Sequence, residues 1–289
     1  MNQRRGDKRW RVFCLAYGQW VTNPKLLVFF GFLVLMRKLV ILPIRSAASM
    51  MDQPLNLWEV CIALGNSEVI LLFLPIFYIV MVSDCPKLGQ DLYYLIPRAG
   101  RMDWFMGQVV FMAAAAFGYL LVIVLVALVQ VANIAYAVNA WSLVTTDFDT
   151  SPYAGMGISM NCLIPMNLHY QMPPLQAFLY TYLLQFFYLL LWNSFILLGF
   201  AYGRKSLAFF SALIIVAAGM GLVAVKSPYM WLMPSSHAIL WIHCSKYYRE
   251  FLFWPMASLL LLFLASVVLT VLAARQFGRV NLDSWHGQG

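Results

Sequence analysis

Long uncharged apolar runs set the strongest limit on what this chain can fold into. Residues Val109–Val129 carry no charge, and about 20 apolar residues are enough to cross a bilayer as a helix. Hydrophobic residues make up 63% of the chain and charged residues 10%, against about 25% charged in ordinary soluble domains. Backbone amides in hydrocarbon must be satisfied within their own segment, and the alternating pattern of a barrel is absent. The sequence therefore predicts an all-α integral membrane protein.

Six apolar segments predict a six-helix transmembrane domain over residues 26–289. The expected spans are Leu26–Arg45, Leu57–Ser83, Phe105–Ala135, Pro174–Tyr202, Leu207–Lys226 and Phe253–Ala274. Of the 19 Lys and Arg residues, six precede the first span, three lie in the 84–104 loop, two follow the fourth span and two follow the sixth. Because basic residues mark the cytoplasmic side, we expect a multi-pass protein of the cell (inner or plasma) membrane with both termini cytoplasmic.

The net charge of +8 collects at the ends of these spans, which indicates contact with membrane lipid headgroups and not with nucleic acid. Residues 1–25 predict an interfacial amphipathic helix, with a disordered basic tail as the alternative. On a helical wheel one face is mostly aromatic and the opposite face is polar. The first face holds Trp10, Phe13, Cys14, Tyr17, Trp20 and Val21, and the second holds Lys8, Arg11 and Gln19.

Two longer segments, 136–173 and 227–252, are expected on the external side. The second mixes Pro, Ser and His with bulky apolar residues, which favours short re-entrant helices between the fifth and sixth spans over an amphipathic surface loop. Five dispersed cysteines form no CxxC pattern, and an external pair of Cys162 with Cys244 is left open. His237, His243 and Cys244 match no strong metal-site spacing, so no metal is expected.

The cytoplasmic loop 84–104 carries the most specific signal. It continues into the third span as LGQDLYYLIPRAGRMDWFMGQ over residues 88–108, which reads as a short amphipathic helix, a turn begun by Pro97, and a basic knuckle at Arg98 and Arg101. A rigid knob of this kind suits docking into a groove on a soluble partner.

This loop and the surrounding architecture resemble the type-2 permeases of ABC exporters. Members have an interfacial helix, six spans and external helices between the last two, and their loop after the second span follows Gly-x-acidic-x-x-Leu-x-x-x-Pro-x-x-Arg and ends in Gly-Lys. The corresponding positions here are Gly89, Asp91, Leu95, Pro97, Arg101 and Gly107, in a loose register in which Leu95 lies one position from the family's spacing. Gln108 stands where the family's lysine is usual.

The resemblance implies that the loop is a coupling helix that inserts into a separate ATPase. The chain would then be a transport subunit and not an enzyme. It would bind no cofactor itself, with ATP and Mg on two partner ABC ATPase subunits. A permease subunit with six spans would pair with a second permease subunit, and two copies of this chain are favoured over a heterodimer. The aromatic and Met-rich composition favours an amphipathic substrate such as a peptide, a drug or a lipid-like molecule.

Polar residues within spans are the candidates for a translocation pathway, because such residues are costly in a bilayer. We expect Arg37 and Lys38 near mid-bilayer beside Glu59 and Glu68, as a structural pair, as cations that extend outward, or as a polar wall. A second set follows one stripe of the fourth span and is expected to make helix–helix hydrogen bonds or, less favoured, to touch substrate. Its members are Thr181, Gln185, Tyr188, Trp192 and Asn193.

Two rival functions stay open. Pro234-Ser235-Ser236-His237 is similar to the middle motif of membrane phosphatidic-acid phosphatases, so an intramembrane phosphatase or transferase could use the 234–250 segment. The flanking motifs of those enzymes are missing, and a nucleophilic histidine needs an orienting carboxylate. The other rival is a non-transporting membrane partner subunit, such as a sensor or assembly factor.

Overall fold

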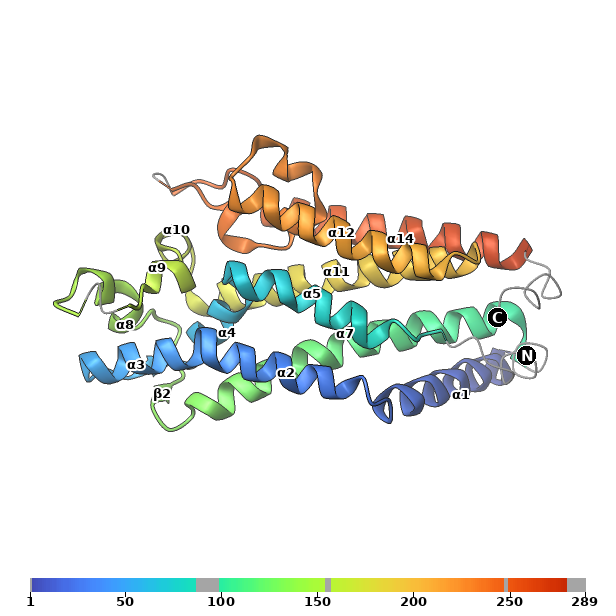
Figure 1. The fold of residues 1–289 in the computed structure, drawn as a ribbon, viewed down its shortest axis with the longest axis horizontal. Helices are drawn as coiled ribbons and strands as arrows, with labels where there is room; N and C mark the ends of the chain where they lie inside the picture. Colours follow the sequence, from blue (N-terminus) through green and yellow to red (C-terminus); the bar gives the residue numbers. More distant parts are fainter. Residues whose placement is uncertain (1, 87–98, 154–156, 247–248, 280–289) are drawn as a thin grey trace.

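The computed structural model describes residues 2–86, 99–153, 157–246 and 249–279, and those residues are mostly helical (Figure 1). The helices in the first half are α1 (Asn2–Val21), α2 (Leu26–Met36), the π-helix η1 (Arg37–Ile41), α3 (Leu42–Met51), α4 (Leu57–Asn66), α5 (Glu68–Val82) and α7 (Arg101–Val131). Those in the second half are α8 (Leu143–Asp147), η2 (Phe148–Thr150), α9 (Met160–Leu163), α10 (Met166–His169), α11 (Pro174–Ala201), α12 (Lys205–Ala224), η3 (Pro228–Leu232), α13 (Pro234–His237), η4 (Leu240–His243) and α14 (Pro255–Arg279). The strands β1 (Leu55–Asn56) and β2 (Ala135–Tyr136) form a parallel pair.

Five helical segments of the described chain are long and apolar enough to cross a membrane. They are Leu26–Met51, Arg101–Val131, Pro174–Ala201, Lys205–Ala224 and Pro255–Arg279. A sixth crossing requires that α4 and α5 count together as one span. The predicted all-α membrane architecture is therefore confirmed at this coarser level.

The first span is longer than expected and contains a π-helical turn. It continues to Met51 instead of ending at Arg45, and the amide of Leu42 donates to the carbonyl of Arg37, five residues earlier. Pro43 explains the position of this turn, because a proline has no amide hydrogen and its ring clashes with the carbonyl four residues before it. The wider turn carries the helix past that proline.

The second span is bent, which corrects the continuous helix expected over Leu57–Ser83. Helices α4 and α5 meet at 75°, and Ser67 between them has extended backbone angles (φ −66°, ψ 123°). Asn66 and Ser67 are both buried, and the side chain of Asn66 donates to the carbonyl of Ile62 in its own helix. The single run of apolar residues thus folds as two helices.

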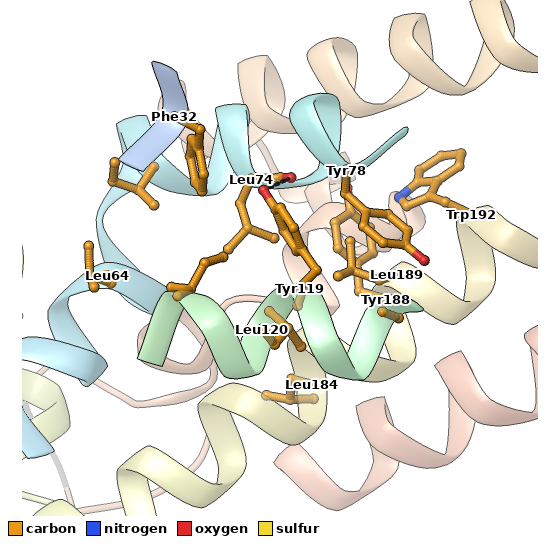
Figure 2. Close-up of a cluster of buried hydrophobic side chains, with 14 of the residues drawn as sticks. Phe32, Leu64, Leu74, Tyr78, Tyr119, Leu120, Leu184, Tyr188, Leu189 and Trp192 are labelled. Atoms are coloured by element: carbon orange, nitrogen blue, oxygen red, sulfur yellow. Dashed lines mark hydrogen bonds between the residues drawn. The ribbon is translucent and has the colours of Figure 1, made fainter. Parts of the chain in front are cut away.

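Helix α11 forms the centre of the bundle. Within its most apolar stretch 61% of residues are buried, against at most 39% in the other four candidate spans. It contacts α4, α7, α12 and α14. Figure 2 shows Tyr188, Leu189 and Trp192 of this helix near Tyr78 of α5 and Tyr119 of α7, with Leu184 and Leu120 beside them.

Helix α1 packs along the start of α7. The Arg9 Nε atom lies 2.8 Å from Asp103 Oδ1, and the rings of Trp20 and Phe111 lie 6.2 Å apart. A Cβ atom on Gly107 would lie 2.7 Å from Val12 Cγ1, so only glycine lets the helices approach this closely. The two helices run in the same direction (Figure 1). Trp10 remains 61% exposed, which leaves part of the aromatic face open, and the expected interfacial position of α1 stays a prediction.

The N-terminal helix and the last helix end on the same side of the molecule (Figure 1), and the expected cytoplasmic side of that end stays a prediction. Helix α1 and the C-terminal end of α14 lie at one end, and α8, α9 and α10 lie at the opposite end (Figure 1). Between α12 and α14 the short helix α13 contacts α11, α12 and α14. Its Ser235 lies beside Tyr188, the middle residue of the 28-residue α11. This depth favours the re-entrant interpretation over a surface loop. We call the α8–α10 end the outer end and the α1 end the inner end.

Candidate functional site

The polar stripe expected on the fourth span is a buried line on α11 that contacts four other elements. Thr181 accepts a hydrogen bond from Asn66 of α4 (3.1 Å), and Gln185 donates to the carbonyl of Ala238 (3.1 Å). The Tyr188 hydroxyl lies 2.9 Å from Ser235 Oγ of α13. These bonds agree with the structural expectation that the stripe holds helices together.

The line continues toward the inner end. Asn193 donates to the hydroxyl of Tyr78 (2.7 Å) on α5 and to the carbonyl of Met112 (3.0 Å) on α7. Trp192 is also buried, and its ring meets that of Tyr188 edge to face. From Thr181 to Asn193 the line covers about 18 Å at 1.5 Å per residue.

Several polar atoms along this line have no partner within the described part of the chain. They are Asn66 Oδ1, Gln185 Oε1, Trp192 Nε1 and Asn193 Oδ1. An unsatisfied buried donor or acceptor costs about 1–3 kcal/mol, and buried waters commonly satisfy such groups. The line therefore offers spare hydrogen-bonding capacity in addition to its structural bonds. This is the feature that makes it a candidate pathway.

The break in the second span meets this line. Trp241 of η4 donates its indole hydrogen to the carbonyl of Asn66 (3.2 Å), which is one of the backbone groups near the bend. Irregular backbone within a membrane protein is tolerated where protein covers it and satisfies its polar groups. The segment between α12 and α14 thus contacts the bend and the α11 line at the same level.

Two buried histidines of the segment between α12 and α14 share one serine. His237 Nδ1 lies 2.8 Å and His243 Nε2 lies 2.7 Å from the Ser258 hydroxyl of α14. The other ring nitrogens face the carbonyls of Trp231 (3.0 Å) and Ile239 (2.8 Å). Carbonyls only accept, so those nitrogens carry the hydrogens of the neutral rings, and both remaining nitrogens need the single Ser258 proton.

Protonation of one of the two imidazoles would give all four ring nitrogens a hydrogen-bond partner. Burial disfavours the positive charge that this proton would bring. Desolvation lowers the pKa of His237 and lowers that of His243 to about 4. The rings of Trp231 and Phe253 lie 5.4–6.2 Å from both imidazoles. We therefore assign a neutral pair at pH 7. His237 is only 4% exposed, and no carboxylate is hydrogen-bonded to it in the described residues.

Glu59 is buried, and its carboxylate caps the start of α4. Its carboxylate accepts from the amide (2.5 Å) and the hydroxyl (2.6 Å) of Ser142 and from the amide of Asn56 (3.4 Å). Asn56 caps the other side of the same turn, so the pair forms a capping box at the start of α4. This carboxylate fastens the outer loop to the start of the second span.

Among the alternatives for Arg37, Lys38, Glu59 and Glu68, the ion pair is not formed, whereas cations that extend outward agree with the structure. Arg37, Lys38 and Glu68 are all exposed, and the ion pairs found among described residues join other partners. Helical position alone does not fix the direction in which a side chain points around the bundle. The two cations of the first span face outward from the chain instead of toward the second span.

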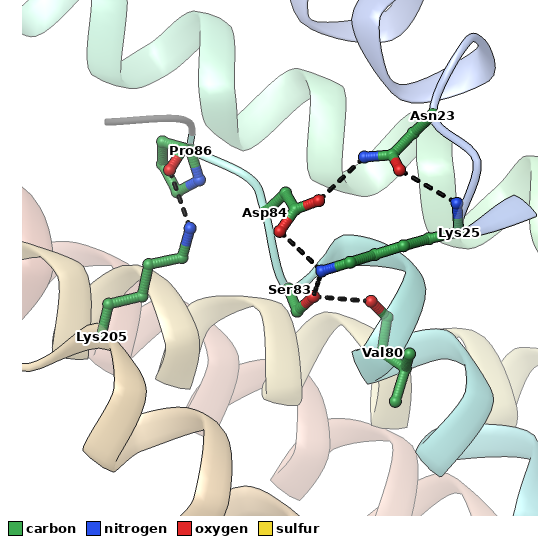
Figure 3. A network of polar contacts seen from close by, with 7 residues as sticks. All are labelled: Asn23, Lys25, Val80, Ser83, Asp84, Pro86 and Lys205. Carbon is green, nitrogen blue, oxygen red and sulfur yellow. Dashed lines mark hydrogen bonds and ion pairs between the residues drawn. The ribbon is translucent and has the colours of Figure 1, made fainter. Parts of the chain in front are cut away.

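Polar contacts at the inner end connect three helices just before the proposed coupling loop (Figure 3). Asp84 accepts from Lys25 Nζ (2.6 Å) and Asn23 Nδ2 (2.9 Å), and Lys25 also donates to Ser83 Oγ (2.7 Å). Lys205 of α12 donates to the carbonyl of Pro86 (2.9 Å). Burial alone would raise the pKa of Asp84, but the hydrogen bonds from Lys25 and Asn23 hold it below its usual value.

Most of the expected coupling residues lie outside the described part of the chain. These are Gly89, Asp91, Leu95, Pro97 and Arg98. Arg101 is exposed at the first position of α7. Gly107 and Gln108 are buried, and Gly107 lies against α1.

Sequence reasoning missed the partners that hold these groups. Ser142 and Ser258 are single serines beside apolar residues and give no signal, and Ser235 stands out only as part of the Pro234-Ser235-Ser236-His237 motif and not as a partner of α11. The Asn56-x-x-Glu59 spacing, in contrast, is a visible capping pattern. The Cys162–Cys244 pair is not formed, since both residues are free thiols and only Cys162 is exposed.

The apolar helices and their buried polar contacts define the class as a multi-pass, all-α membrane protein. No family model, no curated protein and no solved structure matches the chain. Any more specific function must therefore be argued from the chain's own residues.

Proposed function

We propose that this chain is the membrane-spanning permease subunit of an ATP-driven ABC exporter. The sequence of the 88–108 loop suggests this function, and one structural observation carries it. The residues on both sides of residues 87–98 are fastened to the N-terminal helices. Asp84 pairs with Lys25 before the loop, and Asp103 pairs with Arg9 after it.

Such fastening would let a soluble partner move several helices at once. A displacement of the loop would reach α5 and α2 through Asp84 and Lys25, and α12 through Lys205 and Pro86. On the other side, α1 and α7 would move together because they are closely packed at Gly107. A partner that binds one arrangement more tightly shifts the population toward it.

In this proposal two ABC ATPase subunits hold ATP and Mg, and two copies of this chain form the membrane part. Substrate would pass beside the polar line from Thr181 to Asn193, where unpartnered buried atoms can accept or donate hydrogen bonds. The surrounding aromatic side chains suit an amphipathic substrate.

The test is co-purification followed by transport in vesicles. The tagged full-length chain should co-purify with an ATPase from its native membranes. Asp91→Ala, Arg98→Ala and Arg101→Ala should each weaken that association and reduce ATP-dependent transport. Arg204→Ala is the control, because Arg204 is an exposed cation at the same end but outside the loop. Absence of an ATPase, together with unchanged behaviour of all three variants, would refute the proposal.

The two rivals give different results. A phosphatase or transferase that uses the 234–250 segment would lose all turnover in His237→Ala, yet His237 is buried among aromatic rings. A non-transporting partner subunit would behave the same with and without nucleotide.

A further inference from the structure

A hollow of about 710 Å³ lies along the first span on the outer half of the molecule. Arg37 and Arg45 line it together with Ser46 and Ser49, and Asp52 lies at its far end. Arg37 and Arg45 are eight residues apart, or about 12 Å along a helix. The hollow therefore runs along one side of η1 and α3 as an elongated groove, with polar and charged side chains among an otherwise apolar lining.

The depth of Arg37 is unusual for an exposed cation. The span Leu26–Met51 has 26 residues, which at 1.5 Å per residue is about 39 Å. Arg37 lies near its middle, is exposed, and has no hydrogen bond or ion pair among the described residues. Charged side chains at this depth face water-filled cavities or binding partners in nearly all membrane proteins.

The local backbone and the second arginine indicate a formed groove. Arg37 begins the π-helical turn, and such turns occur frequently at functional sites. Arg45 is held in place because its Nη1 donates to the carbonyl of Gln130 at 2.5 Å. Arg37 near the middle of the span, and Arg45, Ser46 and Ser49 toward its outer end, make the groove cationic and rich in donors, while the one lining acid, Asp52, is exposed at the outer mouth.

We infer that this groove binds the anionic headgroup, phosphate or carboxylate, of a membrane amphiphile, with its alkyl part in the adjoining lipid. Arginine suits this chemistry because its planar group donates two parallel hydrogen bonds to such oxyanions. The inference deepens the proposed function, because it gives the amphipathic substrate a negative charge. Only the claim that the bound amphiphile is transported rests on that proposed function. Binding itself does not depend on the ATPase.

The experiment measures lipid binding to the purified full-length chain without any ATPase. The chain is placed in nanodiscs of phosphatidylcholine, and retention of added phosphatidylglycerol is measured by native mass spectrometry. Arg37→Gln and Arg45→Gln should each weaken retention about tenfold, as expected for loss of one charge-assisted hydrogen bond. Lys38→Gln is the matched control, because it removes an exposed cation next to Arg37 that does not line the hollow.

Two further arms complete the test. Arg37→Lys keeps the charge and should retain more binding than Arg37→Gln, which separates headgroup recognition from misfolding. Millimolar inorganic phosphate should compete poorly, whereas equal competition would assign the site to soluble anions and overturn the amphiphile. Equal loss in Arg37→Gln and Lys38→Gln, or no preference for the anionic lipid, would also overturn the inference. Such a failure would leave ATPase association intact, so it is distinguishable from failure of the proposed function.

Discussion

Acidification should destabilise this protein through the two buried histidines that share Ser258. The pKa of His243 lies at about 4 in the folded chain, below its ordinary value of 6.5, because burial disfavours the charged ring. His237 is shifted in the same direction. A folded pKa below the unfolded value means that the unfolded state binds more protons, so stability is complete above pH 6.5 and is lost as the pH falls toward 4.

The magnitude follows from the interval between these two values. One pH unit corresponds to 1.36 kcal/mol, so His243 alone contributes about 3 kcal/mol that disappears by about pH 4. Ser258→Ala tests the same cluster at pH 7. The single Ser258 proton makes one good hydrogen bond to one of the two rings, and its loss should cost about 1–3 kcal/mol.

The assay is thermal unfolding in detergent at pH 4 to 8, recorded for the wild type, Ser258→Ala and His243→Gln. Carboxylates also respond to acid, so the informative quantity is the difference between the wild type and His243→Gln. That difference should shrink between pH 6.5 and 4. His169→Gln is the comparison outside the cluster: burial also lowers the pKa of His169, so its difference from the wild type should shrink in the same direction, and it should do so whether or not Ser258 is replaced. A difference that stays constant or grows toward low pH would refute the assignment of a neutral pair.

Three other predictions concern packing and charge. Gly107→Leu should destabilise the α1–α7 contact by about 1–3 kcal/mol, and Val12→Ala should recover part of this loss in thermal unfolding. Glu59→Gln should cost about 1–3 kcal/mol, because its amide group would face backbone donors; Glu59→Asp, which keeps the charge but shortens the side chain, is the comparison. Asp84→Asn should change stability by less than about 1 kcal/mol, since its pair with Lys25 is more than one-third exposed, yet it should reduce transport while ATPase association persists. If Asp84→Asn lost ATPase association to the same extent as transport, the proposed mechanical connection through Asp84 would be contradicted.

The apolar runs predict most of the fold, because membrane-crossing length and helical hydrogen bonding leave few alternatives. The expected limits of α11 differ from the structure by one residue at one end. The stripe from Thr181 to Asn193 is buried as one line because helical periodicity alone places its members together. Such features follow from local geometry.

Features that depend on how helices rotate against each other were not predictable in this way. Arg37 and Glu68 both lie toward the middle of antiparallel apolar segments, but nothing in the sequence sets the direction in which each helix presents them. The bend at Ser67 was not predicted from the sequence, for a related reason. Two polar residues hardly change the hydropathy of a long apolar run, and the bend depends on Trp241, which is 175 residues from Asn66 in sequence.

Under the proposed function, the interruptions of the first two spans lie where movement of the helices would be easiest to accommodate. The π turn η1 contacts α4 and α7, and the 75° bend joins α4 to α5. Segments on either side of such interruptions can reorient with less loss of backbone hydrogen bonding than a continuous helix. The inner halves, α2 and α5, are the ones that Lys25 and Asp84 connect, while the outer halves carry the groove at Arg37 and Arg45 and the buried Glu59. A pull on the inner end would therefore change the angle of α2 and α5 against an outer part fixed by Ser142 and Trp241. The polar line of α11, which meets this bend at Asn66, would be the first surface to be uncovered.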